Sequence, residues 1–204
     1  MYKQYINGEL VQGKGVQVDV LDPADNSVIT KLDTASVEQC QEALEAAKAA
    51  FKGWAATPIG VRIEWLLKLG DAIQAERETI AELLSAESGK PYDTAMEDLG
   101  MFDRYLKYFA EEGKRVDGTT VYTPGKSYGE LYHAVEHRPL GVVVGHIAWN
   151  YPIGMLVLKV APAMVAGDPL IVKPASDTPL ATLYVGEICK RIGLPKGVIN
   201  IVCG

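Results

Sequence analysis

Cysteine is scarce in this chain of 204 residues: Cys40, Cys189 and Cys203 are the only ones, and no two of them form a CxxC pair. Such a small, odd number of thiols excludes a disulfide framework and is typical of a reducing compartment. Cys40 and Cys189 fall within predicted helices, where we expect them to be core residues. The N-terminus also lacks the apolar run of a secretory signal, so the sequence predicts a cytoplasmic protein.

A long uninterrupted hydrophobic run is missing as well. The most apolar stretch, residues 152–172, contains Lys159 and Asp168 and is broken by glycine and proline, so we do not expect it to cross a membrane. A surplus of positive charge is also absent, because 20 Lys and Arg face 26 Asp and Glu for a net charge of −6. Binding along a nucleic-acid backbone needs a basic footprint. Membranes and nucleic acids are therefore excluded as main partners, whereas a small anionic ligand held by one or two lysines is not.

The residues that are present suit a globular core, since 48% are hydrophobic and 23% are charged. Residues 1–33 are predicted to form short strands, with a hairpin around Asn7-Gly8. Helices then dominate, and Ser36 is a suitable N-cap for the first of them. The predicted helices span residues 36–54, 77–87 and 91–114, and a further one opens at Pro58.

Three of these helices carry an apolar stripe that is expected to face the core. In the helix that opens at Pro58 the stripe consists of Ile63, Leu66, Leu67 and Ile73. In the helix over residues 36–54 the stripe consists of Val37, Cys40, Leu44, Ala47 and Phe51. In the helix over residues 91–114 it consists of Met101, Tyr105, Tyr108 and Phe109.

A break rich in glycine and proline, residues 113–127, separates this helical part from the second half of the chain. Residues 128–138 then alternate between the two faces of a strand, and we expect residues 121–139 to form an extended arm outside the main sheet. The strand contains His133-Ala134-Val135-Glu136-His137, which matches the HxxEH pattern of some zinc peptidases. On a strand the two histidines would lie roughly 13 Å apart. That distance is too great for one shared metal ion, so no metal site is predicted.

From residue 140 onward, apolar strands alternate with helices. The predicted elements are strands at 142–144, 170–172 and 198–202 and helices at 152–166 and 178–192. The run Val142-Val143-Val144 is typical of a parallel strand covered on both faces, and Thr178-Pro179 is expected to cap the second helix. This order builds a βαβαβ unit, which is half of a doubly wound parallel sheet. The fold class is therefore α/β, and because no helix follows the third strand, we expect one face of the sheet to be bare.

Two segments follow the first two of these strands, at the edge where α/β sheets bind ligands. In residues 145–152, Asn150 offers an NH₂ donor that can point at a developing oxyanion. An asparagine two residues before Pro152 equally suits a helix N-cap, and the residues alone leave both interpretations open. In the second segment, Lys173-Pro174-Ala175-Ser176, Lys173 suits a ribose or a phosphate, or it is a solvated loop lysine. The G-x-G-x-x-G fingerprint is absent after the first strand, so a dinucleotide would have to bind without that turn.

Together these segments resemble the aldehyde dehydrogenase superfamily over the whole chain. The matching parts are residues 5–9, 54–69, 138–142 and 159–168, the Trp149-Asn150-Tyr151-Pro152 turn and the Lys173-Pro174 loop. A succinate-semialdehyde dehydrogenase-like member is one candidate within the superfamily. The resemblance implies oxidation of an aldehyde to a carboxylic acid through a thiohemiacetal on a catalytic cysteine, with hydride transfer to NAD or NADP. It also implies a Rossmann-like cofactor domain that departs from the usual dinucleotide fingerprint.

The resemblance implies catalytic roles for two residues. Asn150 looks like the oxyanion donor. Lys159 looks like a lysine near the catalytic centre with a proton-relay role, or else it is a charge that interrupts an apolar helix. The catalytic cysteine and the general-base glutamate of the family correspond to positions beyond Gly204. Cys203, at the end of the third strand, is not expected to be that nucleophile.

Four further residues are implied at the cofactor site. Ile147 looks like a backbone contact, Trp149 like a wall, and Lys173 like the contact to the ribose. Many NAD-dependent members have Glu where this chain has Ser176, and family members commonly have Pro where it has Ala148. A Glu would repel a 2′-phosphate, so with Ser176 we expect cofactor use to lean towards NADP or to be permissive.

The implied organisation has three parts. Residues 1–120 form the helix-rich part of the cofactor-binding domain, residues 121–139 an oligomerisation arm, and residues 140–204 the βαβαβ part, while the catalytic domain is absent. The chain is thus expected to be the N-terminal fragment of an NAD(P)-dependent aldehyde dehydrogenase acting on a small aldehyde. It would form a homo-oligomer or need a missing C-terminal half. The alternative is a non-catalytic remnant that only binds a nucleotide or another subunit.

Overall fold

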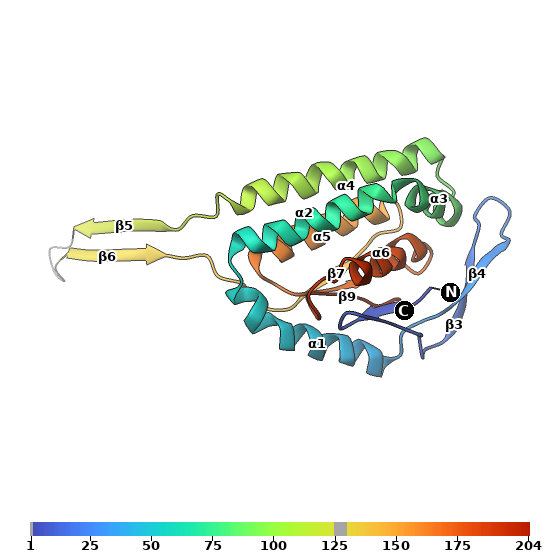
Figure 1. Ribbon diagram of the computed structural model, residues 1–204, viewed down its shortest axis with the longest axis horizontal. Helices are drawn as coiled ribbons and strands as arrows, with labels where there is room; N and C mark the ends of the chain where they lie inside the picture. Colours follow the sequence, from blue (N-terminus) through green and yellow to red (C-terminus); the bar gives the residue numbers. More distant parts are fainter. Residues whose placement is uncertain (1, 125–129) are drawn as a thin grey trace.

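The computed structural model describes residues 2–124 and 130–204 (Figure 1). A five-stranded sheet lies at its centre, with the strand order β2-β1-β9-β8-β7. β7 (Val143–His146), β8 (Leu170–Lys173) and β9 (Ile199–Ile201) are parallel. β1 (Gln4–Ile6) pairs antiparallel with β9, and β2 (Glu9–Val11) completes that edge. The α/β class and the parallel strands are confirmed, and the N-terminal hairpin joins the same sheet.

The predicted hairpin turn at Asn7-Gly8 is confirmed between β1 and β2. Both residues have a positive φ, 51° for Asn7 and 81° for Gly8. A two-residue hairpin loop needs this conformation, and Asn and Gly adopt it at little cost. A second hairpin, β3 (Gln17–Leu21) with β4 (Val28–Asp33), forms a separate two-stranded sheet.

Six helices occur in the described part of the chain, and each agrees with a predicted helix to within a few residues. They are α1 (Val37–Ala56), α2 (Ile59–Ala75), α3 (Arg77–Ser88), α4 (Tyr92–Gly113), α5 (Pro152–Ala166) and α6 (Leu180–Arg191). Local signals set several of their ends. Ser36 and Gln39 form a reciprocal capping box at the start of α1. Gly89, with a φ of 67°, ends α3 in the left-handed conformation.

The helices cover both faces of the central sheet (Figure 1). α5 and α6 pack on one face, α1 crosses the other over β1, β8 and β9, and α2 and α4 form an outer layer against α5. The expectation of a bare sheet face is therefore wrong for these strands, because α1 folds back across strands that come far later in the chain. At the edge strand β7, Val144 is 56% exposed, so this strand is not covered on both faces as predicted.

The buried face of α1 differs from the predicted stripe. Ala47 is buried as expected, and Ala43 is buried beside it, but Val37 is 77% exposed. Cys40 is exposed too, which corrects its expected place in the core. The small side chains of the alanines let the helix approach the sheet closely, and Trp54 is the one large apolar residue of α1 that is buried beside them.

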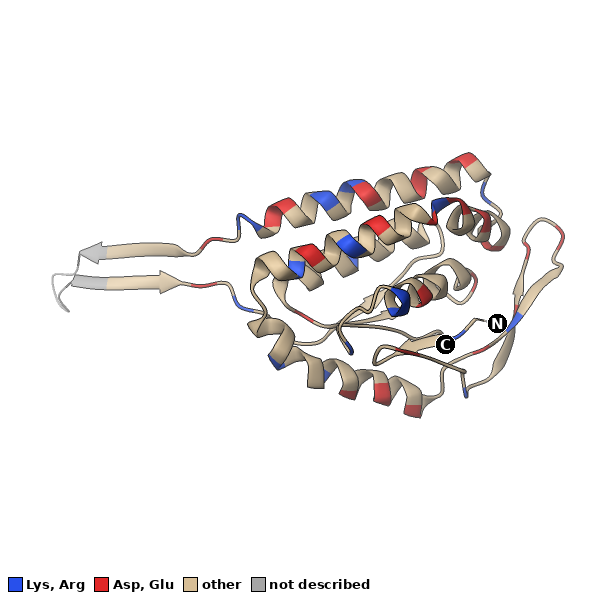
Figure 2. Cartoon of the chain, in the orientation of Figure 1, with Lys and Arg blue, Asp and Glu red and all other residues tan. Residues whose placement is uncertain are grey.

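The outer helix α4 shows the same kind of difference. It buries Leu99, Phe102 and Leu106, whereas Tyr105 and Tyr108, which were expected to face inward, are exposed. Charged residues of both signs are spread over the outer helices α1, α2 and α4 (Figure 2).

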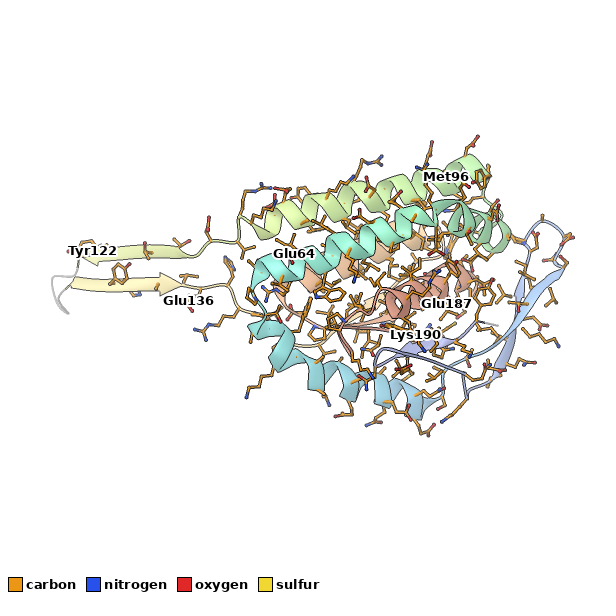
Figure 3. All side chains as sticks on the ribbon, viewed as in Figure 1. Glu64, Met96, Tyr122, Glu136, Glu187 and Lys190 are labelled. Atoms are coloured by element: carbon orange, nitrogen blue, oxygen red, sulfur yellow. The ribbon has the colours of Figure 1, made fainter. Side chains whose placement is uncertain are left out.

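The predicted arm is a separate two-stranded antiparallel sheet. β5 (Thr119–Pro124) pairs with β6 (Glu130–Val135), with Thr119 opposite Val135, and residues 125–129 between them lie outside the described part. The ribbon projects away from the helices and the central sheet, and Tyr122 and Glu136 mark its length (Figure 3). His133 lies on β6 rather than on a helix.

Candidate functional site

The two segments singled out in the sequence start side by side at the carboxyl edge of the parallel strands. His146 of β7 is in register with Lys173 of β8. Beyond the strand, the backbone N–H of Ile147 donates to the backbone oxygen of Lys173 at 2.9 Å. Ile147 is buried and Lys173 is half-buried. This edge is where open α/β sheets bind ligands.

The turn before α5 presents its polar and aromatic side chains to solvent. Trp149 is 64% exposed, and Asn150 is exposed as well. The N-cap residue of α5 is Tyr151, which makes no side-chain cap hydrogen bond. Instead, Asp98 of α4 accepts a hydrogen bond from the backbone N–H of Gly154 at 2.6 Å. The helix is therefore capped from α4 and not by Asn150, which leaves the Asn150 amide available to a ligand.

A lysine that sequence reasoning missed lies against the same turn. The Nζ of Lys90 donates to the backbone oxygen of Asn150 at 2.9 Å and to Oδ2 of Asp98 at 3.4 Å. It also lies 4.6 Å from the centre of the Tyr151 ring, within the range of a cation–π contact. In the sequence, Gly89-Lys90-Pro91 signals a helix boundary and nothing more.

Asp98 is fully buried where it bridges Lys90 and α5. Burial raises the pKa of its carboxyl group, and the nearby Lys90 and the donated backbone N–H groups of α5 act in the opposite direction. A carboxylate at this position also meets the positive end of the α5 dipole.

Lys159 lies away from the turn, two helical turns into α5. The position is about 10 Å along the helix axis from Pro152. Its stem packs on β7, since a Cβ added at Gly145 would lie 3.1 Å from the Lys159 Cβ. The structure thus places the Lys159 stem against Gly145, near the end of β7.

The loop after β8 leads into α6, which is also capped from a distance. Ser176 is exposed in this loop. Glu87, at the end of α3, accepts hydrogen bonds from the backbone N–H groups of Leu180 at 2.6 Å and Ala181 at 3.0 Å. The expected cap from Thr178 is wrong, because its Oγ1 is buried without a hydrogen-bond partner in the described structure.

The environment of Glu87 opposes its charge. Burial raises the pKa of its carboxyl group to about 7, although the two N–H groups of α6 and Lys90 favour the charged form.

Cys189 and Cys203 are buried, and the burial of Cys189 was expected. Cys40, which was also expected in the core, is exposed. Burial raises the pKa of the Cys189 thiol to about 12 and that of Cys203 to about 11. Because the thiolate is the nucleophilic form of cysteine, this burial argues against Cys203 as a nucleophile.

The described residues contain no group of three or more His, Cys, Asp or Glu side chains that could hold a metal ion. None of the helices described is both long enough and apolar enough to cross a membrane. A hollow of about 540 Å³ opens at the base of the arm, between α2, α4, α5 and residues 137–140. None of the six predicted site residues lines this hollow.

Comparison with known proteins agrees with this arrangement. A sequence model described as the aldehyde dehydrogenase family matches residues 10–204. The chain is 38% identical over 203 residues to the non-phosphorylating aspartate-semialdehyde dehydrogenase of Halomonas elongata, covering 98% of this chain and 40% of that protein. It is 34% identical over 204 residues to the 3,6-anhydro-alpha-L-galactose dehydrogenase of Vibrio sp. strain EJY3, covering all of this chain and 42% of that protein.

Solved structures show the same similarity. An aldehyde dehydrogenase of Brucella melitensis matches with a TM-score of 0.93 and 36% identity, covering 100% of this chain and 42% of that one. A betaine aldehyde dehydrogenase of Staphylococcus aureus in complex with NAD+ matches with a TM-score of 0.91 and 30% identity, covering 100% and 41%. A 3,6-anhydro-L-galactose dehydrogenase in complex with NADP matches with a TM-score of 0.91 and 33% identity, covering 100% and 42%.

This chain spans about two fifths of the length of these relatives, and its match to the family model extends over nearly all of its own residues. The chain belongs to the aldehyde dehydrogenase family.

Proposed function

We propose that this chain is the N-terminal part of an NAD(P)-dependent aldehyde dehydrogenase that oxidises a small aldehyde to a carboxylic acid. The observation that carries the proposal is the junction of Ile147 and Lys173, joined by a 2.9 Å backbone hydrogen bond. It brings the Asn150 turn and the Lys173 loop to one edge of the sheet in a member of this family. An oxyanion donor and a cofactor contact can therefore act on the same bound molecules.

The donor set at this edge fits a nicotinamide dinucleotide. The ammonium group of Lys173 and the hydroxyl group of Ser176 offer donors to ribose hydroxyl or phosphate oxygens. Trp149 offers an exposed aromatic wall, and Ile147 is buried directly after the end of β7. NAD or NADP bound there would supply the acceptor for the hydride lost from the substrate carbon. The residues of this chain bind and orient it.

Asn150 is proposed as the oxyanion donor. Its side-chain N–H₂ would hold the aldehyde oxygen as negative charge develops on it, a contribution of about 3–4 kcal/mol in comparable sites. Lys159, whose stem lies on Gly145 at the end of β7, is proposed to supply a positive charge or a proton relay at that edge. The nucleophilic cysteine and the general base are proposed to belong to a part of the protein outside these 204 residues.

Residues 1–120 and 140–204 are proposed as the cofactor-binding domain and residues 121–139 as an oligomerisation arm. The second candidate is a non-catalytic remnant that binds only a nucleotide or another subunit. It is supported by the same open edge together with the buried thiols, and an intact-mass measurement on the protein from its source separates a clipped enzyme from a genuine short product.

Nucleotide titration of the purified chain tests the proposal. We expect NADP and NAD to change the fluorescence of Trp149, identified by its loss in Trp149→Phe. Lys173→Met should weaken binding by about tenfold or more, because it removes a charge-assisted hydrogen bond.

Lys196→Met is the matched control, since Lys196 is exposed and pairs with Glu9 away from the Lys173 loop. Equal affinity of the wild type and Lys173→Met would contradict the assignment of Lys173.

A further inference from the structure

The Asn150 turn has little of its own to hold it in place. Trp149 and Asn150 are exposed, and α5 starts without a side-chain cap from its neighbouring residue. A donor amide is useful only when it is held in place before the reaction. The groups that fix this turn must therefore come from elsewhere in the fold.

Those groups come from the link between α3 and α4, which carries Lys90, and from the N-terminal part of α4, which carries Asp98. The Lys90 ammonium holds the turn at its first half, through the backbone oxygen of Asn150 at 2.9 Å and the ring of Tyr151 at 4.6 Å. Asp98 holds the first turn of α5, which directly follows, through the backbone N–H of Gly154 at 2.6 Å. The two side chains also pair with each other at 3.4 Å, so one ion pair holds both the turn and the start of the helix that follows it.

The packing around Gly154 shows how tightly α4 meets this turn. A Cβ on Gly154 would lie 2.7 Å from Oδ1 of Asp98 and 2.8 Å from Sδ of Met101. A side chain at this position would force Asp98 or Met101 to shift, so the glycine permits the approach that lets Asp98 reach the backbone.

Burial of the ion pair indicates positioning rather than stability. The Asp98 side chain is 0% exposed and the Lys90 side chain 10% exposed. Removing two charges from water costs about as much as their attraction returns, so such a pair adds little net stability. The pair instead supplies two hydrogen bonds of fixed direction. The Lys90 ammonium donates to the backbone oxygen of Asn150, and the Asp98 carboxylate accepts from the backbone N–H of Gly154.

We propose that Lys90 and Asp98 are positioning residues that hold the Asn150 turn in the geometry needed for its side-chain amide to act as a donor. The role of that amide rests on the proposed function, whereas the hold on the turn does not depend on it. Neither Lys90 nor Asp98 needs to touch the substrate.

Fluorine NMR of the chain labelled with 5-fluorotryptophan tests the proposal, with the Trp149 resonance assigned from Trp149→Phe. Amide hydrogen exchange at Gly154 is measured on the same samples. We expect Lys90→Met and Asp98→Asn to shift or split the Trp149 resonance and to speed exchange at Gly154 by about tenfold or more, as expected when a charged hydrogen-bond partner is lost. Lys90→Arg, which keeps the cation, should restore most of the wild-type spectrum.

Lys107→Met is the matched control, because Lys107 makes an exposed ion pair with Asp103 on the same helix. It should leave the Trp149 resonance and the exchange at Gly154 unchanged. If Lys90→Met does not fold, Lys90→Gln replaces it and is read in the same way.

A wild-type Trp149 resonance with a wild-type exchange rate in the Lys90 variants would overturn the proposal, even if their unfolding midpoint fell. If the resonance and the exchange rate change as expected but neither NAD nor NADP binds to the wild type, the positioning role stands. In that case it is the proposed function that fails.

Discussion

Ser176 is exposed in the loop after β8, three residues beyond Lys173. A glutamate there would accept a hydrogen bond from a ribose 2′-hydroxyl and would repel a 2′-phosphate. We therefore expect Ser176→Glu to lower the affinity for NADP by about tenfold or more relative to NAD, the range of a lost charged contact. Titration with both cofactors gives the ratio of dissociation constants. Ser176→Gln controls for side-chain size. An unchanged ratio of the two dissociation constants in Ser176→Glu would contradict the prediction.

The thiols of the chain bear on its activity. Burial raises the pKa of Cys203 to about 11, so this residue stays a neutral thiol near pH 7, and acyl transfer needs a thiolate and a base besides an oxyanion donor. We expect the purified chain, at verified mass, to give no reduced cofactor with a panel of small aldehydes and semialdehydes.

Absorbance of the reduced cofactor measures this turnover. A rate that is abolished by Cys203→Ser, and kept by Cys40→Ser at the exposed cysteine, would contradict the expectation and identify Cys203 as the nucleophile.

At the scale of elements, the start of α5 meets α4 at Gly154. Gly154→Ala would force a methyl group against Asp98 and Met101, and overpacking of this kind costs about 1–3 kcal/mol. Gly53 in α1 is the matched control, because a Cβ there meets nothing within 4 Å. Gly53→Ala should instead stabilise the protein by about 0.5–1 kcal/mol. Urea unfolding measures both free energies, and the same sign for the two variants would show that Gly154 is not confined as described.

The start of α6 depends on the protonation of Glu87. Burial raises the pKa of this residue from 4.5 to about 7 in the folded protein. Between these values the folded state holds a proton that the unfolded state has released. The free energy of unfolding should therefore fall as the pH rises from about 5 to about 7 and then level off.

Glu87→Gln should reduce this slope, because an amide does not titrate. The pH dependence of the unfolding free energy for the two proteins tests the assignment, and it is refuted if the slopes coincide. Burial also raises the pKa of Asp98. This residue therefore contributes equally to the pH dependence of the unfolding free energy in the wild type and in Glu87→Gln.

At the scale of the whole molecule, the arm is the least supported part of the fold. A two-stranded ribbon is marginally stable alone, its edges offer unpaired backbone groups, and its apolar residues Val121, Tyr132 and Val135 are exposed, Tyr132 by 75%. We expect the chain to be an oligomer at tens of micromolar by light scattering. A double variant, Tyr132→Ser with Val135→Thr, should lower the mean mass.

Val37→Thr, at an exposed apolar position on α1, serves as the control and should leave the mass unchanged. A clean monomer of the wild type at that concentration would contradict the prediction.

Signals that act within a few residues predicted their structures well. The Asn7-Gly8 turn and the N-cap at Ser36 both form as expected. The buried faces of helices were less predictable. Hydrophobicity predicted that Val37 and Tyr105 would be buried, but both are exposed, and Ala43 is buried because its helix lies close to the sheet. The sequence of a helix alone does not say which neighbouring element it will pack against.

The sequence by itself determined the α/β class, the order of helices and strands, and the two segments that carry the candidate site. Each of these depends on local backbone preference, on hydrophobic period or on a motif of neighbouring residues. The tertiary structure alone decided what holds the site. Lys90 reaches Asn150 across 60 residues and Glu87 reaches α6 across 93. No period or local motif relates such distant residues, because their contacts arise only when α3 packs on α6 and α4 packs on α5. That packing brings the charges of Glu87 and Lys90 to the free N–H groups of α6 and to the C=O group of the turn before α5.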